Sequence, residues 1–144
     1  MATKFSEIYP LFLSSIDDYT LAELEDDELE ELLEGYLMNG LVHLSESISD
    51  LEDYDIEAKR FNADLYHTEK VAIAKAMKLE WLNERIYAED LMRRAIGDRD
   101  YKAVQGTDYI RRLGAQARTL RDEIERDLIN HSYRRKEFIG GLWD

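Results

Sequence analysis

Cysteine is absent from the chain, and proline occurs once among its 144 residues. Without cysteine there is neither a disulfide framework nor a thiolate metal site, and we expect a reducing compartment. A turn-rich β-fold needs more proline and glycine than the one proline and seven glycines present. No run approaches the roughly 18 apolar residues of a membrane-spanning helix, and the first residues lack the apolar core of a signal peptide. We therefore expect a helical protein without a leader or a membrane contact.

Motifs for catalysis or metal binding are also missing. His43, His67 and His131 are far apart and lack a spacing such as His-x-x-x-His. No glycine-rich phosphate loop occurs. The acidic run 53–64 has spacing similar to that of a calcium loop, but Ala58 stands where the sharp turn needs glycine. We expect no enzyme activity, no catalytic residues, no bound metal and no cofactor.

Negative charge is abundant and unevenly spread. The net charge is −13, yet residues 1–69 hold 19 Asp and Glu against three Lys and Arg, whereas residues 70–144 hold 13 against 16. Such an acidic chain is unsuited to gripping nucleic acid, which is bound by neutralising phosphates with Lys and Arg. Two interpretations stay open: a solvated face that keeps the protein soluble, or a surface that DNA passes without sticking.

Residues 68–82 predict the central helix. Apolar residues surround most of its circumference, which is typical of a helix wrapped by others. Thr68 is the predicted N-cap, and Glu69 is suited to the positive end of the helix dipole. Lys75 and Lys78 have long aliphatic stems that let their charges reach water from a nearly buried helix.

An earlier amphipathic helix is predicted over residues 27–44, capped by Asp26 or Asp27. Its leucines and Tyr36 recur at spacings of three and four. Gly40 falls on the apolar face, which indicates a close approach of two helices. The opposite face carries a strip of negative charge, which consists of Asp27, Glu30, Glu31 and Glu34. The usual interpretation of such a strip is a solvated face.

The remaining segments complete an all-α prediction, a small helical bundle with a long C-terminal helix. Pro10 predicts a short helix starting near Tyr9. Residues 45–66 predict a loop with a short helix near 57–65. Residues 83–85 predict a break or a kink, followed by a helix over 88–96 that ends at Gly97. Residues 98–106 predict a polar connection anchored by Tyr101 and Val104. Thr107 is the predicted cap of the long final helix, which runs to about residue 133. Its inward stripe repeats at steps of three and four: Ile110, Leu113, Ala117, Leu120, Ile124, Leu128 and His131.

We divide the chain into a helical domain, residues 1–136, and an extended C-terminal arm, residues 137–144. Gly140-Gly141 is expected to prevent a rigid helix in this arm. The arm either folds back on its own core or docks on another protein, with Trp143 as an anchor. The candidate docking residues are Arg134, Arg135, Phe138, Ile139, Leu142 and Trp143.

Several stretches resemble the head–tail adaptor (connector) proteins of tailed bacteriophages. They are Leu21-Ala22-Glu23-Leu24, Leu79-Glu80-Trp81-Leu82, Leu91-Met92-Arg93-Arg94-Ala95-Ile96-Gly97-Asp98-Arg99-Asp100-Tyr101-Lys102 and Ser132-Tyr133. The likeness covers most of the chain in order and spacing, except residues 45–66. It implies a helical protomer that forms a ring, often of twelve copies, beneath the portal and extends the DNA channel toward the tail.

The function expected from this resemblance is that of a structural connector in the virion neck, assembled in the host cytoplasm. Its expected partners are the portal protein, a tail-side neck or stopper protein, further copies in a ring (a dodecamer by the resemblance), and DNA that passes without specific binding. An acidic DNA mimic, or a regulatory protein that binds a basic partner, is the alternative from a different class.

Overall fold

The computed structural model describes residues 2–16, 19–44, 49–105 and 108–143, without the side chains of residues 19, 20, 132 and 134–143. The described elements, in chain order, are β1 (Thr3–Lys4), the 3-10 turn η1 (Phe5–Glu7), α1 (Tyr9–Leu13), α2 (Tyr19–Ala22), α3 (Asp26–Gly40), the 3-10 turn η2 (Leu41–His43), β2 (Tyr54–Asp55), β3 (Arg60–Phe61), α4 (His67–Ile96), α5 (Asp98–Gln105) and α6 (Tyr109–Trp143). Helices dominate, which confirms the all-α prediction and the long C-terminal helix.

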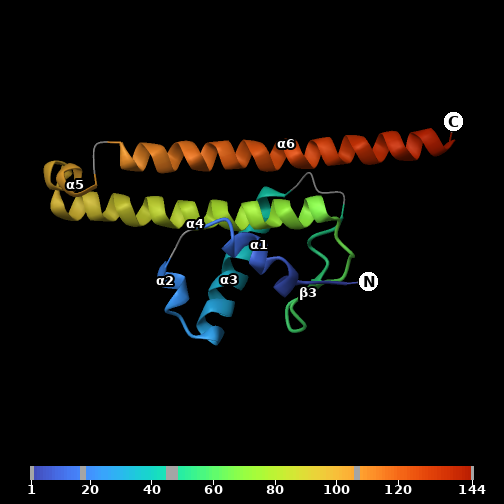
Figure 1. Cartoon of the computed structure of the whole chain (residues 1–144), viewed down its shortest axis with the longest axis horizontal. Helices are drawn as coiled ribbons and strands as arrows, with labels where there is room; N and C mark the ends of the chain where they lie inside the picture. The colour runs from blue at the N-terminus through green and yellow to red at the C-terminus, as the bar shows by residue number, and fades with distance from the viewer. Residues whose placement is uncertain (1, 17–18, 45–48, 106–107, 144) are drawn as a thin grey trace.

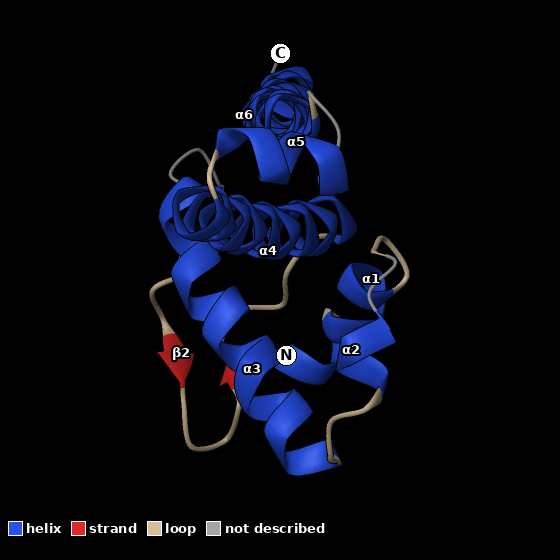
Figure 2. Ribbon diagram, turned by 90° about the vertical axis from the view of Figure 1, so that its left-hand side faces the viewer, coloured by secondary structure: helices blue, strands red, loops and turns tan. Residues whose placement is uncertain are grey.

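Helix α4 forms the middle layer of the molecule (Figures 1 and 2). Helix α6 runs antiparallel to α4 along one side, and α5 lies at the end where the two are joined. Helices α1, α2 and α3 and the small sheet lie on the opposite side of α4. The central helix predicted from residues 68–82 is therefore confirmed.

Helix α4 is longer than predicted. It begins at His67, one residue before the predicted cap Thr68, and the Glu69 side chain accepts a hydrogen bond of 3.1 Å from the Tyr66 backbone N–H. It continues without interruption to Ile96, so the predicted break at residues 83–85 is wrong. Those residues include neither glycine nor proline and are compatible with a helix interior. Gly97, with φ of 89°, ends the helix as predicted, because glycine adopts this conformation without a Cβ penalty.

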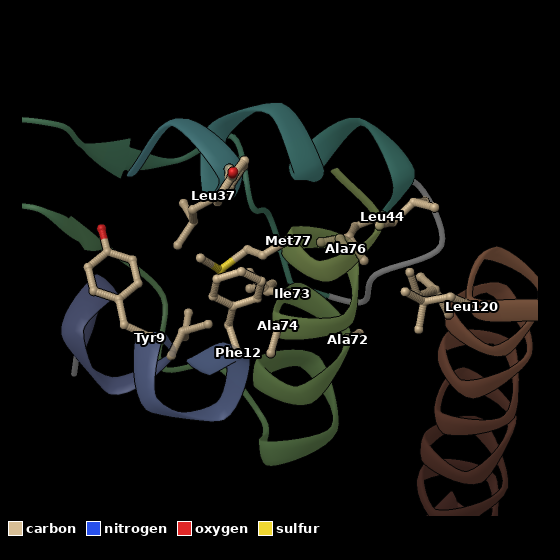
Figure 3. Packing of buried hydrophobic residues seen from close by; sticks show 14 of the residues in the cluster. Tyr9, Phe12, Leu37, Leu44, Ala72, Ile73, Ala74, Ala76, Met77 and Leu120 are labelled. Atoms are coloured by element: carbon tan, nitrogen blue, oxygen red, sulfur yellow. The ribbon is translucent and has the colours of Figure 1, made fainter. Parts of the chain in front are cut away.

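The core lies between α4 and the layer of α1, α3 and the small sheet. Phe12, Leu37, Ile73 and Met77 are completely buried there and come from α1, α3 and α4 (Figure 3). On the other side of α4, most of the predicted apolar stripe of α6 is buried, namely Leu113, Ala117, Leu120, Ile124 and Leu128. Ile110 and His131, at its two ends, are partly buried, and the predicted cap Thr107 lies outside the described residues. The two faces of α4 thus share one hydrophobic cluster, which explains why its apolar residues surround the helix.

Gly40 brings α3 against α4, as its position on the apolar face predicted. A Cβ atom on Gly40 would lie 3.1 Å from the carbonyl carbon and the Cβ of Ala76, and 3.2 Å from the Ala76 oxygen. Helix α3 itself begins at Asp26 after Glu25, so neither predicted cap residue occupies the flanking position. The absence of a side chain at Gly40 permits the close helix crossing.

We expect Gly40→Val to destabilise the protein by about 1–3 kcal/mol, because the added atoms meet the backbone of α4 rather than a movable side chain. Gly35→Ala is the matched control on the same helix. A Cβ at Gly35 meets no atom within 4 Å, so we expect this change to stabilise the protein by up to about 1 kcal/mol through helix propensity. Urea unfolding followed by circular dichroism measures both. Equal effects of the two substitutions would contradict the close approach.

A three-stranded antiparallel sheet, in the order β1-β3-β2, occupies part of the region where a helix near 57–65 was predicted. That prediction is wrong. Phe61 of β3 is paired with Thr3 of β1 and with Tyr54 of β2. The Thr3 hydroxyl donates to the Ala63 carbonyl at 3.1 Å and accepts from the Leu65 N–H at 2.9 Å. The N-terminal strand therefore fixes the segment that leads into α4.

The segment 98–106, predicted as a polar connection, contains helix α5. Tyr101 is a buried anchor as predicted, and its hydroxyl donates a 2.9 Å hydrogen bond to the Glu89 carboxylate of α4. Burial and this hydrogen bond raise the pKa of Tyr101 to about 12. Val104 is 65% exposed, so its prediction as a second anchor is wrong.

The backbone of helix α6 continues to Trp143, beyond the predicted end near residue 133. The expectation that Gly140-Gly141 prevents a helix is therefore wrong, since glycine lowers helix stability without forbidding it. The side chains of the predicted docking residues, Arg134 to Trp143, lie outside the described part of the structure.

Candidate functional site

The described residues contain no cluster with the composition of a metal centre. Among them, no group of three or more His, Cys, Asp or Glu side chains is arranged to hold a metal ion. None of the described helices combines the length and the apolar character needed to cross a membrane. The features that remain for function are charged and apolar surfaces.

The acidic strip of α3 lies on the side of α4 opposite to α6 (Figure 2). Asp27, Glu30 and Glu31 are exposed, and Glu34 is partly buried. Helix α3 carries six acidic residues and no Lys or Arg. The four predicted residues therefore lie on one helix, as the spacing indicated. Their contacts differ: Glu30 and Glu34 lie near Lys59, whereas Glu31 lines a hollow beside α4.

Lys59, at the turn between β2 and β3, pairs with the strip. Its Nζ lies 2.9 Å from the Glu30 carboxylate and 3.8 Å from that of Glu34. The hydrogen bond with Glu30 raises the pKa of Lys59, and the charges of Glu30, Glu34 and Asp27 raise it further. One edge of the strip is thus partly compensated by the hairpin.

Tyr9 lies under the same edge. Its ring is buried, and its hydroxyl makes no hydrogen bond in the described structure. Burial, followed by the charges of Glu34 and Glu30, raises its pKa. The negative charge along this edge of α3 therefore contributes to the raised pKa of both Tyr9 and Lys59.

The other edge of α3 faces a groove against α4, which we call the α2–α4 groove. It consists of two hollows of about 410 and 270 Å³ that share Leu32, Tyr36 and Glu84 in their walls. Further apolar wall residues are Leu21, Leu24, Trp81 and Ala88, and further acidic ones are Glu28 and Glu31. The Arg85 guanidinium lies 5.4 Å from the centre of the Trp81 ring. The groove is therefore apolar inside and mainly acidic at its rim.

Exposed apolar side chains continue from this groove along α4. Tyr87 is 66% exposed and Leu91 is 45% exposed, and both lie within one turn of the groove residue Ala88 on the same helix. Large exposed apolar side chains next to an apolar hollow are typical of a surface that contacts another protein.

At the far end of the molecule, α6 extends beyond α4 (Figure 1). The His131 ring lies 4.9 Å from the ring of Tyr66, the residue before α4 begins. The helix continues for 12 residues after His131, a length of about 18 Å at 1.5 Å per residue. We call residues 132–143 the C-terminal overhang.

Two ion pairs join α6 to α4 on the body of the molecule. Lys75 Nζ lies 2.6 Å from the Asp127 carboxylate and 3.6 Å from that of Glu123. All three side chains are partly buried. Lys75, predicted to reach water, is 29% exposed and also holds the two long helices together.

Sequence reasoning missed the groove and the pairing of Lys59. The groove forms because α2, α3 and α4 meet at an angle, and the spacing of residues within a single helix does not predict this angle. Lys59 did leave a signal, since it is one of three basic residues among the first 69, and a cation in so acidic a segment is expected to find carboxylates.

The described geometry therefore places an acidic helix and an apolar groove on one side of α4, and a projecting helix end at the far end of the chain. Comparisons with protein-family models, with curated proteins and with solved structures find no match to this chain.

Proposed function

We propose that this chain is a head–tail adaptor of a tailed bacteriophage, a non-enzymatic protomer that forms a ring beneath the portal, extends the DNA channel and links the capsid to the tail. The resemblance of residues 21–24, 79–82, 91–102 and 132–133 supports this proposal. The all-α bundle with a long C-terminal helix agrees with the fold that the resemblance implies.

The separation of charge across α4 is the observation that carries the proposal. Helix α3, with six acids and no base, lies on one side of α4, and the arginine-containing helix α6 lies on the other (Figure 2). Unlike faces on opposite sides of a protomer favour head-to-tail contacts, and such contacts close into rings when the rotation allows.

An acidic channel wall suits the passage of DNA, because fixed negative charge offers phosphates no site of attraction. Asp27, Glu30, Glu31 and Glu34 are the proposed channel-facing residues. Lys59 lowers the negative charge near Glu30 and Glu34, so Asp27 and Glu31 carry the larger share of the repulsion in this proposal. The overhang, with its basic and apolar residues, reaches the portal or the next copy.

Co-sedimentation with the portal protein of the same phage tests this function. We expect the chain to comigrate with the portal as a ring of many copies, visible by electron microscopy. Deletion of residues 137–144 is expected to abolish comigration while helicity falls only by the few residues removed, because the buried stripe of α6 from Leu113 to Leu128 lies before the deleted segment. Failure of the full chain to bind the portal would overturn the proposal.

The strongly acidic α3 also favours a second candidate, an acidic DNA mimic that binds a basic partner. Such a protein acts as a monomer or dimer and competes with DNA. A stable complex with a DNA-binding enzyme, weakened by charge reversal at Asp27 and Glu31 and accompanied by no ring on the portal, would support it over the adaptor.

A further inference from the structure

The α2–α4 groove is open, although its walls are largely apolar. Leu32, Tyr36 and Trp81 line it from two helices, and the exposed Tyr87 and Leu91 extend it along α4. Glu28, Glu31 and Glu84 stand at the rim of its larger hollow. A surface of this kind fits a helix that carries apolar residues on one side and positive charge beside them.

The C-terminal overhang has that composition. Its sequence contains Arg134-Arg135-Lys136, followed by four large apolar residues, Phe138, Ile139, Leu142 and Trp143. Positions 138 and 142, like 139 and 143, are four residues apart, so all four fall within one side of the helix that the backbone forms here. The basic run matches the three rim carboxylates in charge.

The groove and the overhang lie toward opposite ends of the molecule (Figure 1). The groove is formed where α2 and α3 meet the middle of α4, whereas the overhang projects past the start of α4. A straight helix beyond His131 leads away from the groove of its own chain. The occupant that fits is therefore the overhang of a second copy.

We propose that the α2–α4 groove of one copy binds the C-terminal overhang of the next copy, with Arg134-Arg135-Lys136 against Glu28, Glu31 and Glu84 and the apolar positions 138–143 in the hollow. This head-to-tail contact rests on the proposed function, since it names the contact between neighbouring copies in a ring. It moves Glu31 from the proposed channel wall into that contact. The two interacting surfaces differ, so an open row of copies keeps a free groove at one end and a free overhang at the other until the ring closes.

Disulfide trapping tests the contact in the full chain, which has no cysteine of its own. One batch carries Ala88→Cys in the groove and the other Gly141→Cys in the overhang, and the two are mixed and oxidised. We expect a disulfide-linked heterodimer at about tenfold higher yield than with Glu57→Cys, an exposed site on the hairpin, in place of Ala88→Cys. Equal yields from the two mixtures would overturn the proposal.

Charge reversal separates a specific contact from random collision. In the cysteine background, we expect Glu31→Arg with Glu84→Arg to lower the heterodimer yield about tenfold, and Arg134→Glu with Arg135→Glu to lower it similarly. Combining the reversed groove with the reversed overhang restores the yield. Glu57→Arg, outside the groove, changes the net charge in the same direction as the groove reversal and is expected to leave the heterodimer yield unchanged. Failure of the combined variants to restore the yield would overturn the pairing.

Portal binding is measured on the chain without introduced cysteines. The adaptor function and the groove–overhang contact can then fail separately. Comigration with the portal and no groove–overhang disulfide would leave the adaptor function standing and overturn the contact. A disulfide that depends on the four charged positions, without any portal binding, would establish the contact and overturn the adaptor function.

Discussion

We expect Ile124→Asp to remove at least about 4 kcal/mol from the free energy of unfolding, most of the 5–15 kcal/mol typical of a natural domain. Ile124 is 1% exposed and belongs to the stripe that packs α6 on α4. The substitution removes apolar contacts and buries a carboxylate, which is costly unless the charge is paired. Nearby Lys75 already pairs with Asp127 and Glu123.

Thr119→Asp is the matched control on the same helix. Thr119 is exposed, and the change introduces the same charge with a similar effect on helix propensity, so we expect a loss within about 0.5 kcal/mol. Urea unfolding followed by circular dichroism compares the two variants. If Ile124→Asp were no more harmful than Thr119→Asp, the packing of α6 on α4 would be refuted.

The loss at Ile124 also has a consequence for assembly. The direction of the overhang is set by the packing of α6 on α4, because residues 132–143 continue the same helix past the contact at His131. A protomer in which α6 separates from α4 loses that direction. We therefore expect disulfide trapping between groove and overhang to decrease in parallel with stability in this variant.

The parts of the fold that were predictable come from residues that repeat on one helix. The stripe from Leu113 to Leu128 predicted α6, and the apolar circumference of residues 68–82 predicted a wrapped central helix; both are confirmed. Gly40 was predictable as a contact because its neighbours on the apolar face are large. In each case the signal lies within one helix.

The errors arise where distant segments decide the conformation. The two-residue strands Tyr54–Asp55 and Arg60–Phe61 are too short for an alternating pattern, and they pair with Thr3–Lys4 from the start of the chain. Residues 83–85 were predicted as a break or a kink between two helical segments, whereas α4 continues through them. The acidic strip was predicted as one surface. In the structure Glu30 pairs with Lys59, whereas Glu31 lines the groove, because the hairpin covers only one edge of α3.

The largest expected effect of a single polar residue is at Glu69, and we expect Glu69→Ala to cost about 3–4 kcal/mol, because it removes several hydrogen bonds to one buried charged group. Glu69 is 1% exposed. Its carboxylate accepts hydrogen bonds from the Ser49 N–H at 2.9 Å, the Ser49 hydroxyl at 2.7 Å and the Tyr66 N–H at 3.1 Å. Alanine leaves these donors without the acceptor and opens a cavity.

A double-mutant cycle with Ser49→Ala measures how much of this loss comes from the Ser49 hydroxyl. We expect Ser49→Ala alone to cost about 1.5–3 kcal/mol, the range for a hydrogen bond to a charged group. Added to Glu69→Ala, it costs much less, because the acceptor is already gone, so the coupling energy is about 1–2 kcal/mol. Glu69→Gln, which keeps the shape and one acceptor oxygen, is expected to fall between the wild type and Glu69→Ala. Independent, additive losses at Ser49 and Glu69 would show that the buried carboxylate does not join the segment at Ser49 to the first turn of α4.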